Sequence, residues 1–162
     1  MKTISLWQSW ASLIVLGAKR FETRSWETLY RGPPLIHAAK KRDRYSLGLI
    51  GQSPFREALS PLFNDSFSSL AQCLPFGCIL GVADLVECWR TFDGVMIGGK
   101  NHTLHLPEGN EREFGDFSTG RYAWQLENVR RFTTPIRYRG AQGLFEVPDH
   151  VVAEQMQIAR AA

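Results

Sequence analysis

The 162-residue sequence predicts an α+β fold that is mainly β, a small curled β-barrel with flanking helices. Short stretches in which apolar and polar residues alternate, as is typical of strands, recur along the chain. Segments with helical periodicity are few and do not alternate regularly with the strands, as a doubly wound sheet would require. Glycines recur inside the strand-like stretches, where a curled sheet needs bends or bulges.

The N-terminal part of the chain combines strands with one helix. An apolar stripe at helical spacing covers residues 8–17 and ends at Gly17, which is suited to a helix C-cap. A basic run, KKRDR, occupies residues 40–44. β-branched and alternating residues predict strands for TISLW at 3–7, RFETRSW at 20–26 and LIHAA at 35–39.

The remaining elements follow from the same periodicities. Residues 45–72 predict two helices with a break at 51–54, and Pro61 interrupts the second. A long strand is expected at 77–89, with Gly77 and Gly81 at bends or bulges. Further strands are expected at 121–132, 135–140 and 143–147, and a terminal helix at 148–161.

Residues 91–120 differ from the rest in being rich in turn residues and acidic. We expect a long insertion or flexible loop there, with room for one short helix. The chain length is that of one domain, so residues 1–162 are expected to form a single domain with this insertion.

The charge is unevenly distributed along the chain. Residues 1–45 carry a net charge of +6, residues 46–120 carry −5, and residues 121–162 carry +2. If the two terminal segments meet in space, one side of the molecule is basic and attracts phosphates and nucleic acid. The alternative is a solvated basic surface without a partner.

Cysteine usage and the N-terminus indicate the compartment. The cysteines at 73, 78 and 88 form no CxxC pair and have no histidine at metal-ligand spacing. We therefore expect reduced core thiols in a cytoplasmic protein, with no metal and no cofactor. The apolar N-terminal stretch is interrupted by polar residues and is too short to span a bilayer, so we expect neither a secretory signal nor a membrane anchor.

The decamer GAKRFETRSW at 17–26 concentrates charge. Strand alternation places Glu22 and Arg24 on one face, about 6.5–7 Å apart along the chain, within reach of each other. In one interpretation this ion pair closes an end of the barrel and Lys19 is solvated. In the other, Lys19 binds a phosphate or polarises a carbonyl, and Arg24 adds planar bidentate donors. Glu22 would then hold one of the cations in place.

Polar and aromatic residues near this decamer are further binding candidates. Trp7 and Trp26 flank the predicted helix and the strand predicted at 20–26, which we call the motif strand. Each of the two either packs in the core or stacks a nucleobase. Ser5 and Gln8 lie at the junction of a strand and a helix, where they could meet an anion. N-capping of the helix is the simpler role for Ser5.

Three other residues complete the candidates. His37, in a predicted strand, is either a satisfied, half-buried residue or an acid–base group for metal-free RNA cleavage. Lys40 either is solvated or follows a phosphate backbone. Tyr122 is expected mainly in the core but could also move a proton. Gln125 and Glu127 face the other way along the same strand and are expected to line a cleft if that side is open.

GAKRFETR matches the G-x-K-x-x-E-x-R signature of the ASCH domain family, which belongs to the PUA-like superfamily. The segments ISLWQSWASLI, LIHAAK, ILGVADLVEC, GRYAWQLENV and GAQGLFEV also resemble ASCH segments, in the expected order. The resemblance implies a PUA-like β-barrel and a role near RNA or its nucleosides. Members are known or proposed as RNA-binding modules, as a single-strand ribonuclease and as an amidohydrolase of N4-acetylcytidine.

One departure from the amidohydrolase pattern bears on the activity. The amidohydrolase relatives carry a threonine, the proposed nucleophile, where this chain has Glu22. A carboxylate lacks the hydroxyl proton that a base would remove, so Glu22 could act only as a base for water, by a different mechanism.

We therefore expect a cytoplasmic protein that binds single-stranded RNA or a nucleotide in a basic cleft. Lys19, Arg24 and Lys40 would form the cleft, and Glu22 would brace it. One enzymatic alternative is a metal-free ribonuclease in which Lys19 stabilises the phosphorane and Glu22, His37 or Tyr122 moves protons. Another is a hydrolase of N4-acylated cytidine nucleosides, and the last is an interaction module without a nucleic-acid partner.

Overall fold

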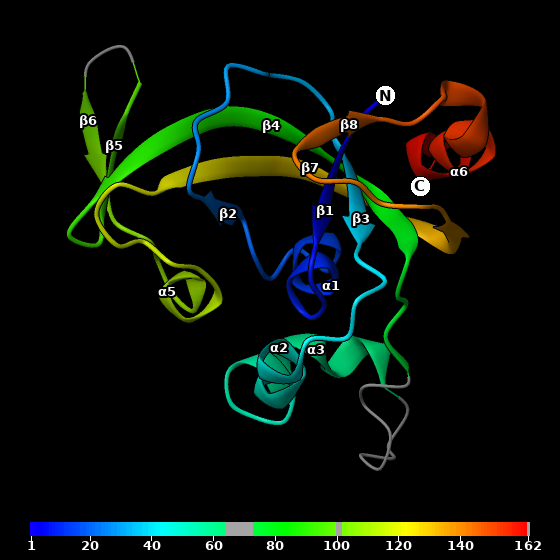
Figure 1. The fold of residues 1–162 in the computed structure, drawn as a ribbon, viewed down its shortest axis with the longest axis horizontal. Coiled ribbons are helices and arrows are strands. Elements are labelled where there is room, and N and C mark those ends of the chain that lie inside the picture. Colours follow the sequence, from blue (N-terminus) through cyan, green and yellow to red (C-terminus); the bar gives the residue numbers. More distant parts are fainter. Residues whose placement is uncertain (64–72, 100–101, 162) are drawn as a thin grey trace. The chain divides into compact units, whose positions relative to one another are not determined.

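The computed structural model describes residues 1–63, 73–99 and 102–161 (Figure 1). Its strands form one mixed sheet of eight strands, in the order β2-β7-β4-β3-β1-β8, with β5 paired to β4 and β6 paired to β5. This confirms the prediction of an α+β fold that is mainly β. The hydrogen-bonded path is open, since it begins at β2 and ends at β8.

The chain divides into two compact units. Unit 1 comprises Met1–Ala18, Pro33–Ala83 and Val129–Ala162, and unit 2 comprises Lys19–Gly32 and Asp84–Asn128. The two long strands, β4 (Cys78–Phe92) and β7 (Tyr122–Arg137), each contribute residues to both units.

The strands of unit 1 pair the N-terminal strand with strands from later parts of the chain. β1 (Lys2–Leu6) pairs in parallel with β3 (Leu35–Ala38) and antiparallel with β8 (Leu144–Glu146). β3 also pairs antiparallel with the first part of β4. At Gly81, a Cβ atom would lie 2.5 Å from the carbonyl oxygen of Arg130, so this close approach of two backbones requires glycine.

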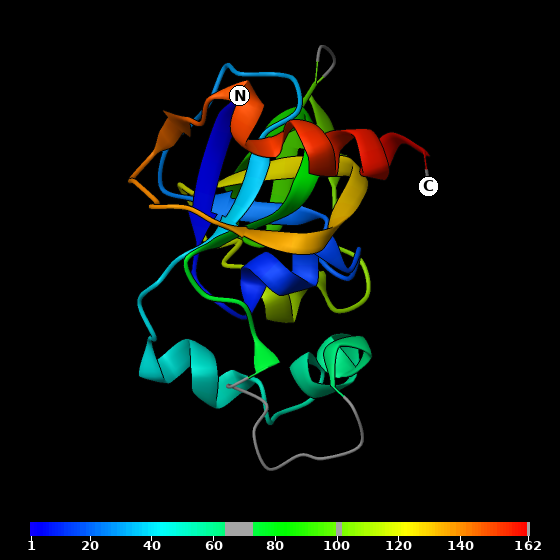
Figure 2. The same cartoon turned by 90° about the vertical axis from the view of Figure 1, so that its right-hand side faces the viewer.

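One apolar cluster of unit 1 joins a helix to the sheet. The C-terminal helix, α6 (Asp149–Ala161), lies alongside the strands that supply the cluster (Figure 2). The members of the cluster are buried side chains from β3, β4, β7, α6 and the segment before α6: Leu35, Ile79, Val82, Phe132, Val147, Val152 and Met156.

The helices of unit 1 agree with the sequence periodicity. The first helix is followed by Gly17 with a φ of +74°, as the predicted C-cap requires. The break within 45–63 is confirmed, and residues 64–72 lie outside the described part. The elements are α1 (Trp10–Val15), α2 (Arg44–Leu49), α3 (Phe55–Leu59), the 3₁₀ turn η1 (Ser60–Leu62) and α6 (Asp149–Ala161).

Unit 2 is built on β2 (Phe21–Arg24), which pairs antiparallel with the first half of β7. Residues 91–120, expected as an insertion with one short helix, contain that helix, α5 (Glu111–Phe114). They also contain a hairpin that the sequence analysis did not predict, formed by β5 (Val95–Gly98) and β6 (Thr103–His105).

Two sequence predictions differ from the structure. Residues 135–137 continue β7 and do not start a new strand, because Pro135 is tolerated on this strand. Cys73 is exposed, so the prediction that all three cysteines are core thiols is wrong for this residue.

Among the described helices, none combines the length and the apolar character needed to cross a membrane.

Candidate functional site

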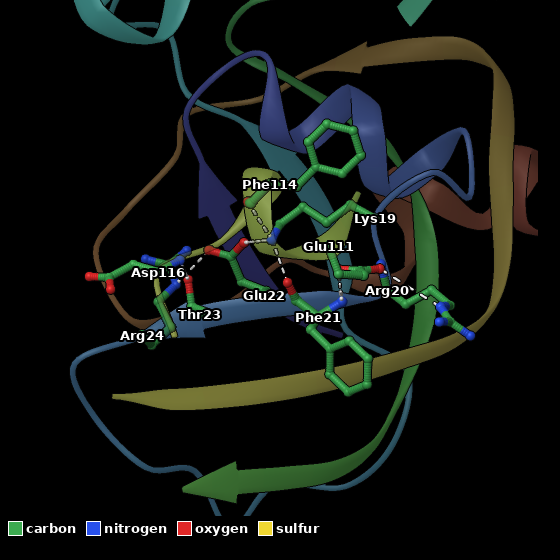
Figure 3. Close-up of polar contacts among 9 residues, drawn as sticks. All are labelled: Lys19, Arg20, Phe21, Glu22, Thr23, Arg24, Glu111, Phe114 and Asp116. Carbon is green, nitrogen blue, oxygen red and sulfur yellow. Dashed lines mark hydrogen bonds and ion pairs between the residues drawn. The ribbon is translucent and has the colours of Figure 1, made fainter. Parts of the chain in front are cut away.

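The ammonium group of Lys19 is buried in unit 2, and its side chain is only 1% exposed (Figure 3). Its Nζ atom donates to the carbonyl oxygens of Phe21 and Phe114, the latter at 2.8 Å. A carboxylate oxygen of Glu22 lies 3.7 Å from the same nitrogen. The two carbonyls accept hydrogen bonds from the ammonium group, and the carboxylate is its ion-pair partner. Burial lowers the pKa of Lys19, while the charges of Glu22 and Glu111 oppose that shift.

Glu22 links the buried lysine to an arginine nearer the surface. Its Oε2 atom faces Lys19, and its Oε1 atom lies 3.0 Å from Nε of Arg24. The alternation of β2 places Glu22 and Arg24 on one face, as predicted, and the arginine bends back to the carboxylate. The side chain of Glu22 is 10% exposed and that of Arg24 is 25% exposed. The carboxylate of Glu22 therefore pairs with the buried ammonium of Lys19 on one side and with the more exposed guanidinium of Arg24 on the other.

The segment around α5 fastens this motif strand, and the sequence analysis missed this contribution. Glu111 is buried and accepts hydrogen bonds from the backbone N–H groups of Arg20, at 2.5 Å, and Phe21, at 3.3 Å. The N–H of Asp116 donates to Oγ1 of Thr23 at 3.0 Å. With the carbonyl of Phe114 on Lys19, the α5 segment thus contacts four residues of the motif (Figure 3).

Aromatic side chains occupy the same face of the β2–β7 ladder as Glu22. In the register, Trp124 is opposite Glu22 and Tyr122 is opposite Arg24. Trp124 is buried, and the ring of Trp26 meets it edge to face, with 4.6 Å between the centroids. The indole of Trp26 is 36% exposed. The partly exposed guanidinium of Arg24 thus contacts the buried Glu22, and the partly exposed indole of Trp26 contacts the buried Trp124.

The register corrects one sequence expectation. Gln125 pairs with Phe21, so it lies on the opposite face of this ladder from Glu22, and by alternation Glu127 lies there too. On that face Gln125 accepts a hydrogen bond from the indole of Trp89 at 2.8 Å and donates one to Glu127 at 2.7 Å. Gln125 and Glu127 therefore do not line a surface with Glu22 and Arg24.

Five of the predicted site residues belong to unit 1, where two of them form a hydrogen-bonded pair. Ser5 and His37 are register partners on β1 and β3, with Ser5 Oγ 2.9 Å from His37 Nδ1. Nε2 of His37 lies 3.0 Å from the carbonyl oxygen of Tyr138. Because a carbonyl only accepts, Nε2 carries the proton and Nδ1 accepts from the serine. Burial lowers the pKa of His37, which favours this neutral form.

The other three residues of unit 1 have separate positions. Gln8 is buried, donating to the carbonyl of Pro75 at 2.7 Å and accepting from the N–H of Ser12 at 3.2 Å, so it connects α1 to the segment before β4. Trp7 is 44% exposed, and Lys40 is exposed. Unit 2 holds the remaining candidates, Lys19, Glu22, Arg24, Trp26 and Tyr122.

Comparison with known protein families identifies the family of the chain. The family model described as ASCH domain matches residues 4–136. The chain belongs to the ASCH domain family. The motif strand and both long strands of the sheet lie within the matched residues, except for the last residue of β7.

Two relatives match a part of this ASCH chain. Activating signal cointegrator 1 from Mus musculus is 38% identical over 85 residues, which are 52% of this chain. The protein of the same name from Homo sapiens is 36% identical over a segment of the same length. The match covers 14% of the length of either relative, so the similarity concerns one segment of a much longer protein.

Replacing the buried ammonium is expected to destabilise the fold strongly. Lys19→Met leaves Glu22 buried with one cation fewer and removes the donor from two buried carbonyls. We expect urea unfolding to show a loss of about 3–5 kcal/mol in the free energy of unfolding. Lys19→Met/Glu22→Leu should recover part of that loss, because it removes both charges.

The neighbouring cation provides the matched control for that measurement. Arg20 has a 54% exposed side chain, and its ion pairs lie at 3.6 and 3.7 Å. Arg20→Met should therefore lower the free energy of unfolding by less than about 1 kcal/mol. Equal losses for Lys19→Met and Arg20→Met would show that the buried ammonium has no special structural role.

The Ser5–His37 pair predicts a pH dependence of stability. The pKa of His37 is lowered below 6.5 in the fold, so the unfolded chain takes up the proton first as the pH falls. The contribution of neutral His37 to the free energy of unfolding is consequently present above pH 6.5 and is lost as the pH falls below that value. Urea unfolding at several pH values should show a flatter profile for His37→Gln than for the wild type. The exposed His150 is the control, and His150→Gln should retain the wild-type slope.

Proposed function

We propose that this ASCH domain binds single-stranded RNA or a nucleotide at the surface of unit 2 formed by Arg24 and Trp26. The observation that carries the proposal is the chain of contacts from buried Lys19 through Glu22 to the partly exposed Arg24. Family membership supports it, because RNA-related roles are what the ASCH resemblance implies. The proposal does not extend to the activity of the longer relatives.

The guanidinium of Arg24 suits a phosphate. It is planar, permanently charged and able to donate to two phosphate oxygens at once. Its Nε atom lies 3.0 Å from one oxygen of Glu22, whose second oxygen faces Lys19, so this ion pair holds the side chain before a ligand arrives. Ordering a long side chain in advance lowers the entropy lost on binding.

The indole of Trp26 suits a base. Its contact with the buried Trp124 fixes the ring, while 36% of the residue remains exposed. Stacking of a nucleobase on an aromatic side chain contributes about 1–3 kcal/mol per base. Tyr122, opposite Arg24 in the ladder and half-buried, extends the aromatic surface beside the guanidinium.

The same contacts favour binding over hydrolysis at this surface. A general base needs an oxygen that reaches the proton to be removed. Both oxygens of Glu22 face cations, and Lys19 is buried between two carbonyl acceptors and the Glu22 carboxylate. Glu22 and Lys19 are therefore best explained as the support for Arg24.

The test is binding of a labelled single-stranded RNA, followed by fluorescence anisotropy in EDTA. Arg24→Ala removes a charged hydrogen-bonding group and is expected to weaken binding about tenfold or more. Trp26→Ala is expected to weaken it about fivefold or more, whereas Trp26→Phe should retain most of the affinity. Gel analysis of the same samples should show intact RNA.

Matched controls lie in the same unit. Arg112, on α5, is an exposed cation, and Leu29 is an 89% exposed apolar side chain. Arg112→Ala and Leu29→Ala should bind RNA almost as the wild type does. Absence of binding by the wild type, or equal losses in Arg24→Ala and Arg112→Ala, would contradict the proposal. Cleavage that is lost in Glu22→Gln would indicate the ribonuclease instead.

A further inference from the structure

Three segments of unit 1 that are distant in sequence meet at Gly77. Its N–H donates to the carbonyl of Ala38, at the end of β3, at 2.8 Å. Its carbonyl accepts from the N–H of Tyr138, just after β7, at 3.1 Å. A Cβ atom at Gly77 would be 3.4 Å from Cβ of Lys40, so the start of the basic run packs against this glycine.

This meeting point gathers positive charge. The part of the basic run that precedes α2 contributes three exposed cations, and the end of β7 with the following segment contributes two more. The charge of Arg137 reaches Cys78, where it opposes the rise in the pKa of the thiol that burial causes. Asp43, the acidic residue of the run, accepts the N–H of Ser46 at the start of α2. We call this set the basic junction: Lys40, Lys41, Arg42, Arg137 and Arg139.

Two of these cations lie over aromatic rings. Nζ of Lys41 is 5.4 Å from the centroid of the Trp7 ring, and Cζ of Arg42 is 4.3 Å from that of Phe76. Such contacts restrain long side chains that would otherwise be mobile. Trp7 remains 44% exposed beside Lys41. Exposed cations interleaved with aromatic rings are the features with which proteins hold single-stranded nucleic acids.

We propose that the basic junction is a second RNA contact, which binds the sugar–phosphate backbone of a single strand while Trp7 stacks one of its bases. This inference rests on the proposed function, and it assigns unit 1 a binding role of its own. Phosphates would contact Lys41 and Arg42, which the rings of Trp7 and Phe76 already orient. The exposed indole favours RNA over an acidic peptide, because a peptide of acidic residues offers no base to stack.

The experiment measures the affinity of the full chain for a labelled single-stranded RNA over a range of salt concentrations. Lys41→Gln/Arg42→Gln removes two charges from the junction. Arg56→Gln/Arg160→Gln removes two exposed charges elsewhere in unit 1 and is the matched control. Each phosphate contact on a single strand contributes about 0.7 to the slope of log K against log salt, or about fivefold in affinity at 0.1 M.

Loss of two such contacts should lower the slope by about 1.4 and the affinity about 25-fold at 0.1 M salt. The control double variant should keep the wild-type slope. Trp7→Ala should weaken binding of the normal strand about fivefold while leaving an abasic strand of equal length unaffected. Equal behaviour of the two double variants would overturn the inference, as would binding of poly-glutamate as tightly as RNA of equal charge.

The outcomes separate this inference from the proposed function. If Arg24→Ala loses RNA and Lys41→Gln/Arg42→Gln does not, the proposed function stands and the second contact is refuted. If the junction variant alone loses RNA, the second contact stands and the role of Arg24 is refuted. No binding by the wild type refutes both.

Discussion

The buried ammonium of Lys19 is the interaction on which unit 2 depends. Removing a charge from water is strongly unfavourable unless it is hydrogen-bonded and paired, and here two carbonyls accept hydrogen bonds while a carboxylate supplies the opposite charge. One carbonyl comes from Phe21, on the motif strand, and the other from Phe114, at the end of α5. A single nitrogen therefore joins two segments more than 90 residues apart in sequence. Glu111 strengthens the connection between these two segments by accepting hydrogen bonds from the backbone N–H groups of Arg20 and Phe21.

Cations have two different physical roles in this ASCH domain. Lys19 is enclosed and stabilises the fold, and through Glu22 it supports Arg24, whose side chain reaches solvent. Lys41 and Arg42 are exposed and are oriented by aromatic rings instead of carboxylates. The first arrangement holds one guanidinium firmly at a defined place. The second keeps two positive charges at the surface, where a polyanion can reach them.

The sequence predicted those features that depend on neighbouring residues, such as the alternation of a strand and the end of a helix. The alternation within β2 placed Glu22 and Arg24 on one face, and Gly17 correctly marked the end of α1. The enclosure of Lys19 could not be predicted, because lysine is almost never fully buried and its acceptors are backbone atoms without a sequence signal. Glu111 lay in a turn-rich acidic stretch where nothing distinguished it from solvated carboxylates. Likewise, the meeting of Tyr138 and the end of β3 at Gly77 depends on tertiary folding alone.

The central claim is that Glu22 holds Arg24 in place before any ligand binds. The most direct measurement is the NMR signal of the Arg24 Nε–H group, recorded in ¹⁵N-labelled protein and assigned with Arg24→Lys. In the free protein this proton should exchange slowly with water, because the Nε atom is buried beside the carboxylate of Glu22, and the signal should shift when single-stranded RNA is added. In Glu22→Gln the exchange should become fast. A signal that exchanges as fast as those of exposed arginines in the free wild type, or that RNA leaves unchanged, would contradict the account.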